Sequence, residues 1–305
     1  MAVPDSGTAL SLAGIKAEVD NNAYNASATA QTSLETLATE TSINSNSSSV
    51  PNSSAPHAMS EWYSYDHDAA PSFTDNISFD LDGTNDYLTQ SSGSFGGTLE
   101  TKGSVSMWVK VDSHSANGVM WQITAEEGTN DQLFILYHNA AGVIRGNVKL
   151  GGTANIVDSG SGLENDGNWH HVVMTWESGS KTAANNIVRL YIDGSQTDTD
   201  AIGNTWGDAS PPAFALFGRN NIQSNAYFNG HLNDMAIFSE VLSSSEVTAI
   251  YNSGSPKDES SHSNLLAYYT LEAYSDSDTT VADDSGNSKT LTINNNTNID
   301  SSDTP

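Results

Sequence analysis

Hydrophobic and polar residues alternate along much of the chain between residues 73 and 251. In residues 105–111, apolar side chains occupy every second position and are separated by Ser106, Trp108 and Lys110. This period of two predicts a β-strand, because successive side chains of a strand point to opposite faces of a sheet. Runs rich in β-branched and aromatic residues predict further strands over 134–137, 171–176 and 187–192.

Turn dipeptides separate these runs. They are Asp82-Gly83, Asp166-Gly167, Asp193-Gly194 and Asn229-Gly230. Between Ser72 and Ser255 the only prolines are Pro211 and Pro212, as expected where most residues take part in strand ladders. Many strands joined by short turns predict an antiparallel sandwich or jelly roll.

One short helix is predicted near the end of this region. Ser243 is placed to cap it, Glu246 follows three residues later, and Val247, Ile250 and Tyr251 share one face. Beyond the helix, two further strands are predicted over 265–271 and 291–293, the second within an acidic, Asn-rich tail.

The first 60 residues have a different composition. Leu12, Ile15 and Val19 recur at helical spacing, and Thr32 with Glu35 predicts a capping box for a second helix. Residues 1–42 are interpreted as an anchor or oligomerisation segment, and residues 43–70 as a polar linker and neck. Such short, weakly amphipathic helices bury little apolar surface, so we expect them to be ordered only when docked on a partner.

The charge balance excludes several classes of protein. The chain has 10 Lys and Arg residues against 37 Asp and Glu residues, a formal net charge of −27. A field of this sign opposes binding to nucleic acid or to an anionic membrane surface. The absence of cysteine excludes disulfides, thiolate metal ligands and a thiol nucleophile. No signal peptide and no membrane-spanning stretch is recognised in the sequence, so membrane insertion is not expected.

Five motifs together resemble one family, the laminin-G-like, concanavalin A-like jelly rolls. In chain order they are Asp80-Leu-Asp-Gly-Thr-Asn-Asp-Tyr-Leu88, Val105-Ser-Met-Trp-Val-Lys110, Gly167-Asn-Trp-His-His-Val-Val173, Arg189-Leu-Tyr-Ile-Asp-Gly194, and Tyr227 to Phe238 followed by Leu242 to Tyr251. The resemblance implies an all-β antiparallel β-sandwich jelly roll over residues 71–305, with its core at 73–252. A strand over 264–272 also resembles the family, which often places this strand first rather than last.

A second resemblance concerns the N-terminus. The segment Pro56-His-Ala-Met-Ser-Glu-Trp-Tyr63, after a helical start and a polar linker, is similar to the start of tail and virion structural proteins of marine phages. This implies a non-enzymatic virion protein, such as a tail fibre, tail-tip or capsid-decoration adhesin on the particle surface. Its partners would be other virion proteins, further copies of itself in a homo-oligomer such as a trimer, and host-surface polysaccharide. The alternative is a secreted carbohydrate-binding or glycan-degrading module of a marine bacterium.

Calcium is the candidate cofactor. Carboxylate and amide oxygens, which calcium prefers, gather around one turn at Asp80, Asp82, Asn85 and Asp86. The resemblance places Asp234 beside this turn and implies structural calcium there. The alternative is that Asp82 and Asp86 only cap the turn through hydrogen bonds to its backbone.

Carbohydrate binding requires an accessible aromatic side chain with polar neighbours. Trp206 in a loop, and Tyr137, His138 and Asn139 at the end of a strand, are the candidate ligand-binding residues. Alternation places Trp108 and Trp176 on a definite side of their strands but does not decide which side is the core.

No catalytic residues are predicted. Paired carboxylates for glycoside hydrolysis would have to share a face of the sheet. Glu126 and Glu127 are adjacent and would face opposite sides of a strand, and Asp198 with Asp200 lacks aromatic neighbours. His170 and His171 are also adjacent, so they are not expected to bind one metal ion, and one of them should lie in the core.

Overall fold

The protein, seen in a computed structural model, divides into two compact units, Met1–Phe73 and Thr74–Pro305. The structure describes all residues except 1–2, 5–9, 22–23, 26–32, 40–42, 45–46, 48, 68–72, 74, 91–94, 96–98, 100, 113–116, 125–131, 151–152, 161–165, 178–185, 203–213, 221–225, 273, 276, 296–297 and 301–302. No helix among the described residues is long and apolar enough to cross a lipid bilayer.

The first unit contains α1 (Leu12–Asn21), α2 (Leu34–Ala38) and the 3-10 helix η1 (Met59–Trp62). Its apolar side chains share one buried cluster, formed by Val3, Ile15, Val19, Leu37, Ala38, Trp62 and Tyr65. The division between an anchor and a neck at residue 42 stays a prediction, and Trp62 and Tyr65 of the neck belong to the same buried cluster as the helices. Trp62 and Tyr65 meet edge to face with ring centroids 5.2 Å apart, which gives the helices a core of their own.

The cap of α2 and a buried glutamate were not predicted from the sequence. The side chain that caps α2 is Ser33, which accepts a hydrogen bond from the Thr36 N–H, rather than Thr32. Glu18 is fully buried, and its carboxylate accepts the backbone N–H groups of Tyr24 and His67 at 2.9 and 3.2 Å. This carboxylate therefore joins α1 to the segment that follows η1.

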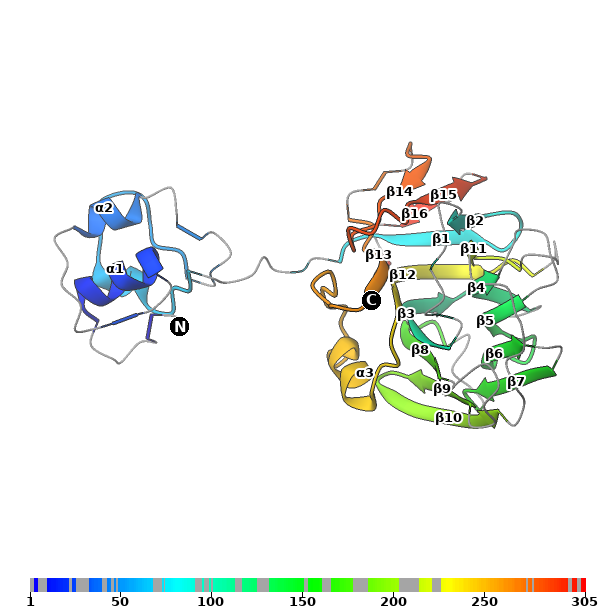
Figure 1. The fold of residues 1–305 in the computed structure, drawn as a ribbon. Coiled ribbons are helices and arrows are strands. Elements are labelled where there is room, and N and C mark those ends of the chain that lie inside the picture. The colour runs from blue at the N-terminus through cyan, green and yellow to red at the C-terminus, as the bar shows by residue number, and fades with distance from the viewer. Residues whose placement is uncertain are drawn as a thin grey trace. The chain divides into compact units, whose positions relative to one another are not determined.

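The second unit is a sandwich of two eight-stranded sheets, and every strand pair in them is antiparallel (Figure 1). Sheet A contains, in spatial order, β10 (Ser195–Ile202), β9 (Asn186–Ile192), β8 (His170–Glu177), β3 (Lys102–Val111), β12 (Asn229–Phe238), β1 (Ser78–Asp82) and β16 (Asn298–Asp300), and β13 (Leu265–Tyr269) also pairs with β12. Sheet B contains β14 (Thr280–Val281), β15 (Leu291–Asn294), β2 (Tyr87–Gln90), β11 (Phe214–Phe217), β4 (Gly118–Thr124), β5 (Gln132–His138), β6 (Ile144–Leu150) and β7 (Thr153–Asp158). The predicted all-β jelly-roll class is confirmed.

Two strands, β1 and β13, pair with the same edge of β12. Between them lie Asn233 and Asp234, and this place is called the junction below. β1 pairs with residues 229–232 of β12, and β13 pairs with residues 235–238. At the junction the register with β3 shifts between Asn233 and Ala236, and Asp234 takes a left-handed conformation with φ of 49°. The late strand predicted from the sequence thus completes sheet A. Asn229-Gly230, expected as a turn, instead begins β12.

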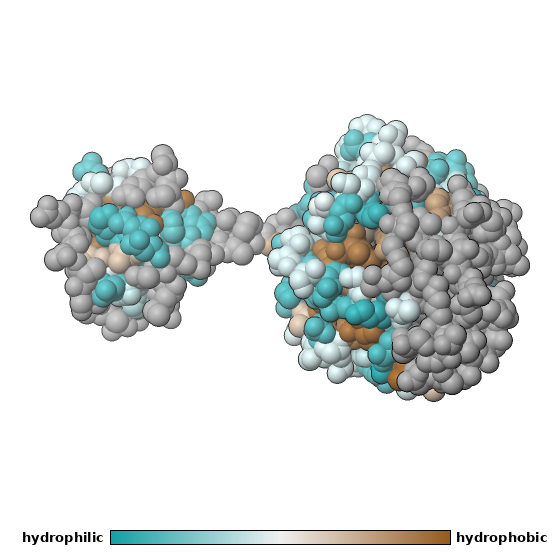
Figure 2. Space-filling model, viewed as in Figure 1, coloured by the Kyte–Doolittle hydropathy of each residue, from teal (hydrophilic) through white to brown (hydrophobic). Residues whose placement is uncertain are grey.

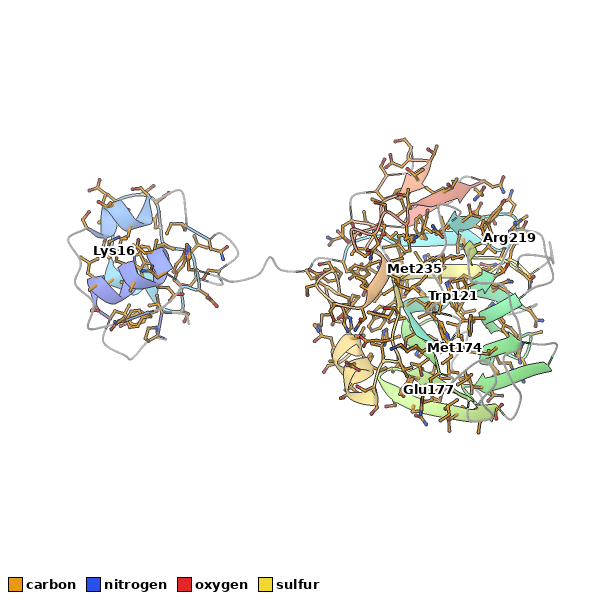
Figure 3. All side chains as sticks on the ribbon, viewed as in Figure 1. Lys16, Trp121, Met174, Glu177, Arg219 and Met235 are labelled. Carbon is orange, nitrogen blue, oxygen red and sulfur yellow. The ribbon has the colours of Figure 1, made fainter. Side chains whose placement is uncertain are left out.

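The core lies between the two sheets. Trp176 of β8 stacks on Phe134 of β5 at 4.3 Å between ring centroids, and on Trp121 of β4 at 6.0 Å. The indole N–H of Trp176 donates to the Leu99 carbonyl at 3.0 Å, which fixes the ring. Figure 3 places Trp121, Met174 and Met235 inside the sandwich. Trp176 is therefore a core residue.

A second apolar cluster lies on the other face of sheet A, beneath α3 (Ser244–Tyr251). The predicted capping box between Ser243 and Glu246 is present. Tyr251 stacks on Trp108 at 5.8 Å and on His171 at 6.1 Å. Trp108 therefore points away from the inter-sheet core but is covered by the helix. On the face drawn in Figure 2, the coloured surface is mainly hydrophilic or pale, with separate hydrophobic areas.

Adding a methyl group at Gly103 should destabilise the sandwich more than adding one at Gly146. A Cβ at either position would lie 2.5 Å from a core side chain, but the neighbour is the fixed Trp176 ring at Gly103 and the flexible Met174 sulfur at Gly146. We expect Gly103→Ala to lower the free energy of unfolding by about 1–3 kcal/mol and Gly146→Ala by less. Urea unfolding of both variants measures this, and equal losses would contradict the role given to Trp176.

Removing the Glu18 carboxylate should loosen the first unit. Glu18→Ala leaves two buried backbone N–H groups without their acceptor, at a cost of about 1–3 kcal/mol for each such group. Hydrogen exchange should then accelerate across α1 and η1 while the strands of the second unit keep their protection. Glu35→Ala, at an exposed position of α2, is the control. Unchanged exchange in the Glu18 variant would show that this carboxylate does not hold the unit together.

Candidate functional site

The outer face of sheet B carries a small group of side chains that do not enter the inter-sheet core. Along β5, Phe134 and Leu136 face the core, whereas Ile135 and Tyr137 face outward. Tyr137 lies opposite Val119 of β4, and Ile135 lies opposite Asn147 of β6. The alternation of three neighbouring strands thus places these residues side by side on one surface.

A pocket of about 180 Å³ lies on this surface. It is lined by Asn117, Val119, Ile135, Tyr137, Asn147, Asn220 and Ala226. Val119, Ile135 and Ala226 are 2%, 6% and 4% exposed and form an apolar cluster against which Tyr137 packs. The pocket therefore combines an apolar floor, one aromatic ring and the amides of three asparagines.

Two of the pocket's asparagines, Asn117 and Asn147, differ in their hydrogen bonds. The Asn117 side-chain oxygen accepts the Ala140 N–H at 3.2 Å. By contrast, the Asn147 Oδ1 atom is buried and has no hydrogen-bond partner among the described residues. A buried acceptor without a donor is costly, so this oxygen is suited to receive an N–H or O–H group from a ligand. None of the described lining residues carries a charge.

Of the four sugar-binding candidates from the sequence, Tyr137 lines this pocket. His138 points inward instead, is 1% exposed, and meets Phe228 edge to face at 5.7 Å. The Asn139 side chain accepts the N–H groups of Ala141 and Val143, so it shapes the turn between β5 and β6. Trp206 lies outside the described residues.

Sequence reasoning missed the asparagines of the pocket. Asn147 had a local signal, since it is a polar residue between Gly146 and Val148, both of which face the core. Asn117 and Asn220 lie outside the strands, and only the pairing of β4 with β5 and β11 brings them to the pocket. Their positions could not be read from the local pattern.

The five residues predicted to bind calcium are divided among three places. The Asp82 carboxylate accepts the N–H groups of Thr84 and Asn85 at 2.7 and 3.1 Å. These are the hydrogen bonds expected if Asp82 caps the turn. Asp86 is 4% exposed and accepts the Asp82 N–H at 3.4 Å, and burial raises its pKa. The Asn85 carbonyl accepts the side chain of Asn295.

Asp80 faces the outer side of sheet A, where its carboxylate lies near those of other residues. Possible ligand atoms of Asp80, Asp112 and His231 lie within 4.8 Å of one another. Lys110 forms an ion pair with Asp303 beside them, and Asp303 lies 3.9 Å from His231. A lysine already supplies positive charge to this group.

Asp234 lies in a third place, the junction on β12. It is 4% exposed, and its Oδ1 accepts the Tyr268 hydroxyl at 2.5 Å. Asp75, just before β1, contributes a second carboxylate, which accepts the Asn233 amide at 2.5 Å. Burial raises the pKa of Asp234 to about 8 and that of Asp75 to about 6. Glu259 is also buried, and burial raises its pKa.

Acidic side chains approach one another at this junction, since the Asp75 carboxylate contributes to the raised pKa of Asp234. The Asp75 Oδ2 atom is buried and has no hydrogen-bond partner among the described residues. When one of two neighbouring carboxyl groups is buried, a shared proton or a bound cation stabilises the pair. The calcium site stays a prediction. Of its predicted residues, Asp234 has the Asp75 carboxylate as an acidic neighbour, and calcium would supply positive charge there through oxygen ligands.

The other acidic and histidine candidates have structural roles. Asp198 accepts the Asp158 N–H at 2.9 Å and so links β10 to β7. Glu126 and Glu127 lie outside the described residues. His171 is buried, and burial lowers its pKa to about 4, whereas the hydrogen bond that His170 Nδ1 donates to the Asp193 carboxylate raises the pKa of His170. One histidine of the pair is in the core, as expected.

Residues 82–248 match the laminin-G-type family described as the Concanavalin A-like lectin/glucanases superfamily. The match covers more than half of the chain, so the protein belongs to this family. It is also 29% identical over 153 residues to the Sushi, von Willebrand factor type A, EGF and pentraxin domain-containing protein 1 of Rattus norvegicus. That region is 47% of this chain and 4% of the rat protein, so the chain spans only a small part of that relative.

A solved structure with a TM-score above 0.5 has the same fold. A putative carbohydrate binding protein from Bacteroides ovatus has a TM-score of 0.54 and 16% identity, and the match covers 76% of this chain and 61% of that one. A SAP-like pentraxin from Limulus polyphemus has a TM-score of 0.45 and 16% identity, with 58% and 82% covered.

Calcium should stabilise the second unit, and Asp234→Asn should abolish that response. A cation at hundredfold excess over its Kd adds about 2.7 kcal/mol to the folded state. Without calcium, Asp234 keeps a proton between pH 3.8 and about 8 that the unfolded chain releases. Stability should therefore fall as pH rises through this range in chelator, and the slope should be smaller in the Asn variant. Melting curves with calcium and with chelator measure both effects.

The control for the calcium response is Asp82→Ala. Because Asp82 caps a turn, this change should lower the melting temperature equally with calcium and with chelator. A wild-type protein that melts at the same temperature in both conditions would show that the junction binds no calcium.

Proposed function

We propose that this protein is a non-enzymatic glycan-binding module whose binding site is the pocket on the outer face of sheet B. The observation that carries the proposal is the combination of Tyr137 with asparagine amides around a shallow apolar floor. Sugars present apolar C–H faces and a rim of hydroxyl groups, and this pocket offers a partner for each.

Two further observations support the proposal. The Bacteroides ovatus protein with the same fold is described as a putative carbohydrate binding protein. The described lining of the pocket contains no Asp, Glu or His, and hydrolysis of a glycosidic bond requires a pair of carboxylates. Binding without turnover is the function that these side chains can perform.

We further propose that the module is displayed on a phage particle, with the first unit as its attachment part. This rests on the resemblance of residues 56–63 to virion proteins and on the presence of a separate unit with its own apolar cluster. Copies would associate more strongly as ionic strength rises, because salt screens the charge of −27 on each chain. The alternative remains a secreted carbohydrate-binding module of a bacterium.

Glycan binding is tested with the full chain on a set of immobilised glycans. The wild type should bind at least one of them, and Tyr137→Ala should weaken that binding by about tenfold or more, because the ring supplies the apolar contact surface. Tyr63→Ala, in the first unit, is the matched control and should bind as the wild type does. Retained affinity in Tyr137→Ala would move the site elsewhere, and hydrolysis of a bound glycan would contradict the non-enzymatic assignment.

A further inference from the structure

The pocket on sheet B places a buried acceptor directly beside an apolar surface. Asn147 lies opposite Ile135 in the register of β6 and β5 and lines the same pocket as Val119 and Ala226. Its Oδ1 is buried and has no hydrogen-bond partner among the described residues. A ligand group that satisfies both features needs an N–H or O–H donor and, next to it, a group without polar atoms.

An acetamido group has this composition. Its amide N–H can donate to Asn147 Oδ1, and its methyl group can lie on the floor formed by Val119, Ile135 and Ala226. A sugar hydroxyl could also donate to the oxygen, but it carries no methyl group beside the donor to lie on the floor. Burying a methyl group on such a floor is favourable, whereas burying an unpaired hydroxyl is costly.

The charge and the volume of the pocket further limit which ligands it can bind. The described lining has no cationic side chain, and Arg145, which lies opposite Tyr137 on β6, forms an ion pair with Asp158. The whole chain carries a net charge of −27. These features oppose a sugar with a carboxylate, phosphate or sulfate group. The volume of about 180 Å³ is below the roughly 300–1,000 Å³ of sites for drug-sized ligands, so the pocket would take one sugar residue of a longer chain.

We propose that the pocket selects a neutral 2-acetamido sugar, with the acetamido group held between Asn147 and the floor formed by Val119, Ile135 and Ala226. This selectivity rests on the proposed glycan binding by the same pocket. It assigns Asn147 as the residue that recognises the amide and Val119 as one that recognises the methyl group.

The test is calorimetric titration of the full chain with methyl glycosides. The probes are those of N-acetylglucosamine, N-acetylgalactosamine, glucose, galactose and N-acetylneuraminic acid. At least one neutral acetamido sugar should bind about tenfold or more tightly than its parent hexose. N-acetylneuraminic acid, which has an acetamido group but also a carboxylate, should bind more weakly than that sugar.

Two variants test the assigned contacts. Asn147→Ala should remove the preference for the acetamido sugar, and Val119→Thr should reduce it, because a hydroxyl replaces a methyl group of nearly the same shape. Asn168→Ala, an exposed amide in the turn before β8, is the control and should leave the preference unchanged. Melting curves show whether each variant is folded, and if Asn147→Ala is not, Val119→Thr decides.

The outcomes separate the two proposals. Equal affinity for hexose and acetamido sugar, or tightest binding of the acidic sugar, would overturn the selectivity and leave glycan binding intact. A preference that survives both substitutions would overturn the assignment to this pocket. A wild type that binds none of these sugars and none of the immobilised glycans would overturn the proposed function, and the selectivity with it.

Discussion

The packing of Trp176 between the two sheets is the contact on which the rest of the second unit depends. This ring bridges the sheets by stacking on Phe134 and Trp121, and its N–H is held by the Leu99 carbonyl. Gly103 leaves the space that the indole occupies. Because interiors are close-packed, a ring fixed in this way sets which side of each strand faces inward. Because side chains alternate along each strand, those between the core residues then lie on the outer faces of the two sheets.

The outer faces of the two sheets differ in what covers them. On sheet A, α3 lies over Trp108 and His171, and Asp303 near the C-terminus binds Lys110 and Trp169. On sheet B, no helix among the described residues lies over β4, β5 and β6, and the pocket opens there. One face of the sandwich is therefore used for internal packing, while the other offers apolar and amide groups to a ligand.

The strong negative charge of the chain is managed in different ways at different sites. Many carboxylates cap turns or accept backbone N–H groups, as Asp82 and Asp198 do. In the first unit, Glu18 is buried but accepts two backbone donors. Asp234 differs, because the nearby Asp75 carboxylate adds to the cost of burying its charge, and a proton or a cation would offset that cost. The acidity of the protein is thus partly a structural feature.

Local patterns in the sequence predicted many of the strands, the class of fold and the cap of α3, whereas they placed the cap of α2 one residue too early. Period-two alternation predicted β3, and a run rich in β-branched and aromatic residues predicted β8. The spacing of Ser243 and Glu246 predicted the start of α3, because helix capping depends only on near neighbours. The sequence also selected Tyr137. Only the tertiary structure decided that Asp234 meets Asp75, that Trp62 packs on α1, and that Asn117 and Asn220 join Asn147. These groups are far apart along the chain, and their meeting depends on sheet order and strand register, which no local pattern specifies.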